Sequence, residues 1–255
     1  MFGATNRRKE PMIKNKLPIL TVIIPIAFIF FGIGKYTQTQ KPQQTQTDSL
    51  RYKNNPNYEL QIGMYDIYKT RQADIVMLGN SLTHGASWNE LLGRTNVVER
   101  GIPSDILQGF LARMQYVYKL NPKICFVLGG LNDIYGWIPV EQVYADYIKV
   151  ITGLQQHHIM PVIQSTVYAG KEWGKSWGTT PEINAGRNIE VAKLNKLLSD
   201  YAKKNNIDYI DLNSKLMTRD NFLNPIYTWD GVHFNSRGFK IWGTEVDKVL
   251  KRHNM

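Results

Sequence analysis

Four short segments of the sequence carry residue types that together could perform acyl transfer. They are residues 79–81, Gly101, residues 129–133 and residues 230–233. A serine hydroxyl is a poor nucleophile until a base takes its proton, and that base must be held by an acceptor on its far ring nitrogen. The segment "TWDGVHF" offers such a base, because Asp230 and His233 are three residues apart in a turn-rich stretch. This spacing can place the Asp230 carboxylate beside the near nitrogen of the His233 ring.

The same chemistry needs hydrogen-bond donors where an oxyanion develops. Three donors are visible: the backbone amide of Ser81 at an expected helix start, the backbone amide of Gly101, and the side-chain amide of Asn132. Each residue also has a purely structural interpretation. Ser81 could cap a helix, Gly101 could form a turn, and Asn132 with Asp133 could form an Asx turn.

The remaining histidines are weaker candidates for the base. His84 sits beside Ser81 but has no fixed acceptor that the sequence reveals, and His157 and His158 lie near the end of an amphipathic helix. His253 lies near the terminus. The sequence therefore favours His233.

The elements that must position these residues alternate between short apolar runs and longer amphipathic ones, which predicts an α/β domain around a parallel sheet. The predicted strands lie at 75–78, 96–99, 124–128, 160–166 and 207–212. The predicted helices cover residues 105–120, 140–157, 191–201 and 236–250, the last after the candidate cap Asn235. Five strands with helices on both faces indicate a three-layer, flavodoxin-like architecture. In such sheets, ligands bind outside the carboxyl ends of the strands, where the four segments fall.

In chain order, Gly-Asn-Ser, Gly, Gly-x-Asn-Asp and Asp-x-x-His resemble the SGNH hydrolases, also called the GDSL esterase family. The resemblance covers roughly residues 74–250 and implies the SGNH hydrolase fold. It implies Ser81 as nucleophile, His233 as general base and Asp230 as its orienting acid. It also implies an oxyanion hole made by Ser81, Gly101 and Asn132. One departure is Asn80, which stands where the family has Asp. The Gly-x-Ser-x-Gly elbow of α/β-hydrolases is absent, since Thr83 follows Leu82.

The amino-terminal part of the sequence predicts a membrane anchor. Residues 1–16 form a basic flank expected on the cytoplasmic side, and residues 17–34 are eighteen consecutive residues without a charge. A cleaved signal sequence is the alternative, although no Ala-x-Ala precedes Lys35. Residues 35–57 read as a polar linker, and the hydrolase domain is expected over 58–255. The domain should then lie on the extracytoplasmic side, or be secreted if the segment is cleaved.

Charge and cysteine content exclude several classes of function. The net charge is +10, but five cations less Glu10 give residues 1–34 a charge of +4, which leaves +6 for the rest. No Lys/Arg block in the domain indicates nucleic-acid binding. The single cysteine, Cys125, lies in an apolar run and can form neither a disulfide within the chain nor a metal site. No cofactor or metal is implied.

The sequence predicts a serine esterase, and the resemblance suggests O-acetyl esters of carbohydrate as the substrate. A lysophospholipase- or thioesterase-like lipid esterase, an O-acetyltransferase acting on cell-envelope polysaccharide, and an inactive binding module are the alternatives. Aromatic residues on loops could stack on sugar rings or bury against the loop itself. These are Trp88, Trp137, Trp173, Trp177 and Trp229. The cations Lys171, Lys175 and Arg187 could bind carboxylates.

Overall fold

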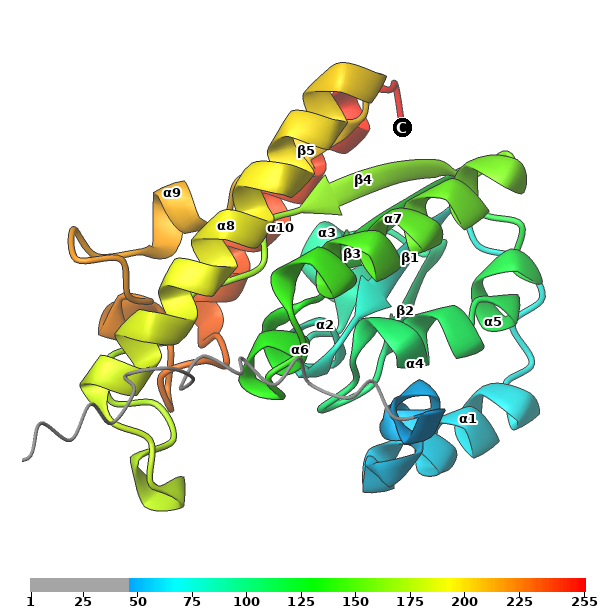
Figure 1. Cartoon of the computed structure of the whole chain (residues 1–255). Coiled ribbons are helices and arrows are strands. Elements are labelled where there is room, and N and C mark those ends of the chain that lie inside the picture. The colour runs from blue at the N-terminus through cyan, green and yellow to red at the C-terminus, as the bar shows by residue number, and fades with distance from the viewer. Residues whose placement is uncertain (1–45) are drawn as a thin grey trace, which may run out of the picture. The chain divides into compact units, whose positions relative to one another are not determined.

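A five-stranded parallel sheet forms the centre of the molecule in the computed structural model, which describes residues 46–255 (Figure 1). The strand order is β2-β1-β3-β4-β5, and every neighbouring pair is parallel. The strands are β1 (Ile75–Gly79), β2 (Val97–Gly101), β3 (Ile124–Leu128), β4 (Met160–Gln164) and β5 (Asp208–Ile210). The central strands are continuous apolar runs because helices cover both faces. The predicted five-stranded parallel sheet is therefore confirmed.

Alternate strand residues face two helical layers. Val76 and Leu78 pack with one set of helices, and Ile75 and Met77 pack with the other. The first layer holds α4 (Leu107–Ala112), α5 (Gln115–Tyr118), α6 (Leu131–Tyr135), α7 (Val140–Gln156) and α8 (Pro181–Asn205). The second holds α2 (Ser81–His84), α3 (Trp88–Leu92), α9 (Asn213–Leu216) and α10 (Ser236–Arg252). The short 3-10 helices η2 (Lys175–Trp177) and η3 (Pro225–Tyr227) lie in loops.

The helix predicted over 105–120 is interrupted, which corrects the sequence analysis. It divides into α4 and α5, and Arg113 at the division has φ −116° and ψ 12°, outside the helical region. The apolar periodicity continues through the break because Phe110, Met114 and Val117 all face the same core. The buried Arg113 guanidinium lies 4.9 Å from the ring centre of Phe110 in α4 and donates to two strand carbonyls.

The helix predicted from about 191 begins ten residues earlier, at Pro181. The Thr180 side chain accepts a hydrogen bond from the Ile183 amide at 3.3 Å, and Pro181 occupies the first helical turn. Both are standard helix-start features. The cap predicted at Asn235 is present, because its side chain accepts from the Arg237 and Gly238 amides.

Residues 46–57, which the sequence analysis assigns to the linker, contain secondary structure. The 3-10 helix η1 (Gln46–Asn54) precedes α1 (Pro56–Ile67), which Asn55 caps. Tyr58 and Tyr65 of α1 pack in a small core with Ile102, and the Tyr65 hydroxyl donates to the Gly101 carbonyl at 2.8 Å. Tyr52 of η1 packs against the same small core, so the packed part of the chain begins before residue 58.

The basic flank 1–16, the predicted membrane segment 17–34 and residues 35–45 of the linker lie outside the described residues. Between residues 46 and 255, no helix combines the length and the apolar character needed to cross a membrane.

Candidate active site

Ser81 lies at the start of α2, directly after the carboxyl end of β1. Asn80, at the position where the sequence departs from the expected Asp, is the cap of this helix. It is buried, and its side-chain oxygen accepts from the Leu82 amide at 3.0 Å. A side chain at Gly79 would overlap with the Thr83 hydroxyl, so only glycine allows this sharp strand-to-helix turn. The sequence Gly-Asn-Ser therefore holds the Ser81 hydroxyl at the edge of the sheet.

His233 lies between Ser81 and Asp230. Its Nε2 is 2.9 Å from Ser81 Oγ, and its Nδ1 is 2.6 Å from Asp230 Oδ2. The other oxygen, Asp230 Oδ1, accepts the backbone amides of Val232 and His233 at 2.9 and 2.8 Å. Burial opposes ionisation of Asp230, but these amides and the His233 ring outweigh it and lower the pKa of this carboxyl. An ionised Asp230 can hold the imidazole in the tautomer that accepts a proton from Ser81.

The loop that carries this pair has a glycine that it requires. Gly231 has φ +99°, and its amide donates to the Thr228 hydroxyl at 2.9 Å. Thr228 in turn donates to the His233 carbonyl at 2.7 Å. A side chain at Gly231 would come within 2.9 Å of Trp173. The conformation of the loop from Asp230 to His233 is thus fixed by the Thr228 hydroxyl as well as by the Asp230 carboxylate.

Gly101 ends β2 beside Gly79 of β1, which places it next to the Ser81 turn. Its amide donates to the Glu99 carboxylate, and His84 Nδ1 lies 3.6 Å from the same oxygen. The nearby Glu99 carboxylate raises the pKa of His84. His84 therefore does have an acidic neighbour, contrary to the sequence analysis, because the strand pairing brings Glu99 to it. No hydrogen bond in the described chain joins His84 to Ser81.

Asn132 follows the third strand at the start of α6, and its side-chain amide donates to the Asp105 carbonyl at 2.8 Å. A primary amide has two N–H groups, so one donor remains available. Gly130, with φ +100°, directs the chain into α6. Ser81, Gly101 and Asn132 follow the ends of three adjacent strands, β1, β2 and β3.

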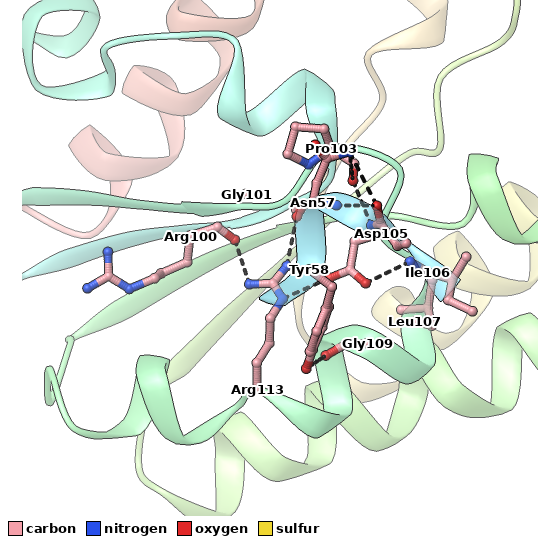
Figure 2. A network of polar contacts seen from close by, with 12 residues as sticks. Asn57, Tyr58, Arg100, Gly101, Pro103, Asp105, Ile106, Leu107, Gly109 and Arg113 are labelled. Carbon is pink, nitrogen blue, oxygen red and sulfur yellow. Dashed lines mark hydrogen bonds and ion pairs between the residues drawn. The ribbon is translucent and has the colours of Figure 1, made fainter. Parts of the chain in front are cut away.

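A buried arginine joins the ends of the first two of these strands, and sequence reasoning missed it. Figure 2 shows the Arg113 guanidinium between the Arg100 carbonyl and the Asp105 carboxylate. Its three donors reach Asp105 Oδ2 at 2.8 Å, the Arg100 carbonyl at 2.9 Å and the Gly79 carbonyl at 2.9 Å. The fixed carbonyls lie immediately before Gly101 and before the turn to Ser81. The available signal was a cation on the apolar face of a predicted helix.

Asp133 is a second buried acid at the site. Unlike Asp105, it has no arginine partner among the described residues. It is 1% exposed, its Oδ1 accepts the Leu107 amide at 3.0 Å, and its Oδ2 has no hydrogen-bond partner among the described residues. Burial raises the pKa of this carboxyl to about 7. Through the hydrogen bond with the Leu107 amide, Asp133 links the start of α4 to the segment that carries Asn132.

Two cavities lie along α6. The Asn132 cavity, about 410 Å³, is lined by residues including Arg51, Tyr52, Ser104, Ile106, Asn132 and Ile138. The α6–α8 cavity, about 450 Å³, is lined by residues including Ile134, Trp137, Ile138, Ile183, Arg187 and Glu190. Ile138 contributes to both walls, so the cavities adjoin.

The candidate aromatic and cationic side chains divide between surface and core. Trp137, Trp177 and Trp229 are exposed, whereas Trp88 is buried against Trp242. Trp173 is half-buried and packs edge-on against Tyr135. Lys171 and Lys175 are exposed, whereas Arg187 is buried. Among residues 46–255, no group of three or more His, Cys, Asp or Glu side chains could hold a metal ion.

Comparison with known proteins identifies relatives of this chain. A family model described as GDSL-like lipase/acylhydrolase matches residues 77–241. N-acylneuraminate cytidylyltransferase of Streptococcus agalactiae is 25% identical over 164 residues, which cover 64% of this chain and 35% of the relative. The chain thus spans about a third of the length of that relative.

Solved structures resemble the fold. A GDSL-like lipase from Bacteroides thetaiotaomicron superposes with a TM-score of 0.66 at 22% identity, covering 77% of this chain and 98% of that one. An acetyl xylan esterase superposes with a TM-score of 0.55 at 20% identity, covering 69% and 98%. At these identities, the likeness concerns the arrangement of helices and strands.

Proposed function

Because this chain belongs to the GDSL-like lipase/acylhydrolase family of ester hydrolases, we propose that it removes O-acetyl groups from carbohydrate through Ser81, His233 and Asp230. The observation that carries the proposal is the continuous hydrogen-bonded series from Ser81 Oγ through His233 to Asp230. A base already 2.9 Å from the hydroxyl can accept its proton as the hydroxyl attacks.

The reaction proceeds in two steps. Ser81 Oγ attacks the acyl carbon while His233 takes its proton, and the protonated imidazole then gives that proton to the leaving alcohol. Water enters and attacks the acyl carbon while His233 takes its proton, and the imidazolium then returns that proton to Ser81 Oγ as the acyl–Ser81 bond breaks and the acid is released. Asp230 remains ionised and stabilises the imidazolium in both steps.

The oxyanion is assigned to the Ser81 and Gly101 amides and the free N–H of Asn132. The Gly101 amide donates to Glu99 in this structure. The carbonyl oxygen of the substrate must therefore displace the Glu99 carboxylate before that donor can act. Asn132 needs no such change, because only one of its N–H groups is engaged by Asp105.

Two observations support a carbohydrate substrate. The side chains of Trp137, Trp177 and Trp229 are each more than 70% exposed, on loops that follow strand ends or lead into the final helix. Exposed indole rings offer large flat apolar faces, which suit packing against the apolar face of a sugar ring. The relative from Streptococcus agalactiae is named for N-acylneuraminate, a sugar derivative. Acetyl as the acyl group is the proposal that the resemblance suggests.

The test measures p-nitrophenol release from its acetate and from longer acyl esters, and acetate release from acetyl xylan. Ser81→Ala should reduce every rate by at least about 10³-fold, because the nucleophile is lost. Retained activity in that variant would refute the mechanism. Preference for long acyl chains would instead favour a lipid esterase. Acetyl transfer to an added sugar acceptor would favour a transferase.

We also propose that residues 17–34 anchor the enzyme, with the folded domain on the extracytoplasmic side. The support is the uncharged run behind a basic flank. The full chain should remain in the membrane fraction after carbonate extraction, and external protease should digest the domain in intact cells or spheroplasts. Recovery of the domain in the medium would favour cleavage and secretion.

A further inference from the structure

Arg187 is a buried cation without a polar partner in the described chain. It is 8% exposed, and its Nη2 is buried with no hydrogen-bond partner. Its guanidinium carbon lies 3.0 Å from the ring centre of Trp137. Glu190 shares the cavity wall but pairs with Lys193 at 2.6 Å. Removing a guanidinium from water without a hydrogen-bonded anion is unfavourable, so this position suits an anion supplied from outside the chain.

The surroundings of Arg187 fit a sugar that carries a negative charge. The α6–α8 cavity offers apolar walls from Ile134 and Ile183, and Trp137 is 76% exposed at its rim. Arg51 lines the adjoining Asn132 cavity, whose wall includes no acidic residue from the described part of the chain. The two adjoining cavities therefore carry two arginines against a single carboxylate, that of Glu190, which pairs with Lys193.

We propose that Arg187 binds a carboxylate in the alcohol portion of the substrate, so that the enzyme deacetylates acidic glycans. This rests on the proposed esterase function. An acetyl group carries no charge, so the anion must belong to the glycan. The ester lies at the Asn132 cavity, and a neighbouring acidic sugar occupies the α6–α8 cavity. There the planar guanidinium donates to the carboxylate, and Trp137 packs against the ring.

The experiment compares acetate release by the full chain from O-acetylated polygalacturonate and from acetyl xylan. The wild type should have the higher kcat/KM on the acidic polymer. Arg187→Gln should lower the ratio of the two kcat/KM values by about tenfold to hundredfold, mainly through KM, because one buried charged hydrogen bond is lost. Arg219→Gln removes an exposed arginine that lines neither cavity, and should leave the ratio unchanged.

A wild type that prefers acetyl xylan would overturn the proposal, as would an unchanged ratio in an Arg187→Gln variant that still hydrolyses p-nitrophenyl acetate. Should that variant not fold, trigalacturonic acid must inhibit wild-type hydrolysis of acetyl xylan more strongly than xylotriose does. Equal inhibition would refute the carboxylate site. These outcomes differ from failure of the esterase proposal, which Ser81→Ala tests on both polymers.

Discussion

Two buried arginines of this molecule are bonded in opposite ways. Arg113 is fully buried, and its guanidinium donates to the Asp105 carboxylate and to two strand carbonyls. Arg187 is almost as buried but has no ion pair or hydrogen bond with any residue in 46–255, and it only stacks on Trp137. Since both side chains are buried, their hydrogen bonds show that the fold uses Arg113, and not Arg187, to stabilise itself. Arg113 holds the strand ends that carry the site through the Arg100 and Gly79 carbonyls. Arg187 lines a cavity and keeps donors that no residue of the described chain uses.

Replacement of Arg113 should have the largest effect on stability. Arg113→Met leaves Asp105 as an unpaired buried charge and removes a charged donor from the Gly79 and Arg100 carbonyls, although the Gly79 carbonyl still accepts the Ile102 amide at 3.1 Å. We expect the free energy of unfolding to fall by about 3–5 kcal/mol, and Tm to fall by roughly 10 °C or more. Thermal unfolding by circular dichroism measures this. A loss below about 1 kcal/mol would mean that Arg113 does not support the strand ends.

A double variant separates the ion pair from the carbonyl contacts. In Arg113→Met/Asp105→Leu no charge is left unpaired, so part of the lost stability should return. About 2–3 kcal/mol should remain lost, because each of the two strand carbonyls has lost a charged donor. Urea unfolding of the single and double variants gives both values. Complete recovery would assign the whole effect to the Asp105 pair.

Asp133 extends the comparison from buried arginines to buried acids. Asp105 pairs with Arg113, whereas Asp133 has no cationic partner among the described residues, so its effect on stability should depend on pH. Its pKa of about 7 exceeds the ordinary value near 3.8, so the folded state holds a proton that the unfolded chain has released. Stability should therefore fall as pH rises from about 4 to 7. The full difference between the two pKa values corresponds to about 4 kcal/mol of stability. In Asp133→Asn we expect the fall in stability to be smaller by about half of this, or about 2 kcal/mol. Tm measured at pH 5 and pH 8 tests this, and identical pH dependence in both proteins would contradict it.

Arg187→Met should have the smallest effect on stability. Within residues 46–255 the substitution removes the stacking on Trp137, worth about 1 kcal/mol, and the removal of an unpaired buried charge offsets this cost. We expect Tm to stay within about 2 °C of the wild type. Differential scanning fluorimetry of Arg187→Met beside Arg113→Met gives a direct comparison. A similar loss of stability in the two variants would erase the distinction between them.

The sequence predicted the sheet and the order of its elements because apolar periodicity and turn residues are local signals. Ser81 follows the end of β1, where ligands of such sheets bind, and Asp230 and His233 lie in the loop directly before the final helix, so the sequence placed all three in segments suited to chemistry. Contacts across the sheet were not visible in the same way. Glu99 reaches His84 and the Gly101 amide only through the pairing of β1 with β2, and Arg113 reaches the Gly79 carbonyl across 34 residues. Thr180 and Pro181 were a local helix-start signal, but the apolar periodicity alone placed the helix only from residue 191.

The hydroxyl of Tyr65, bonded to the Gly101 carbonyl at 2.8 Å, has a practical consequence for work with fragments. A fragment that begins after Ile67 would lack the Tyr65 phenol, whose hydroxyl holds the carbonyl of Gly101, the residue proposed to donate its amide to the oxyanion. The shortest fully active fragment must therefore begin upstream of Pro56 and keep the first helix intact.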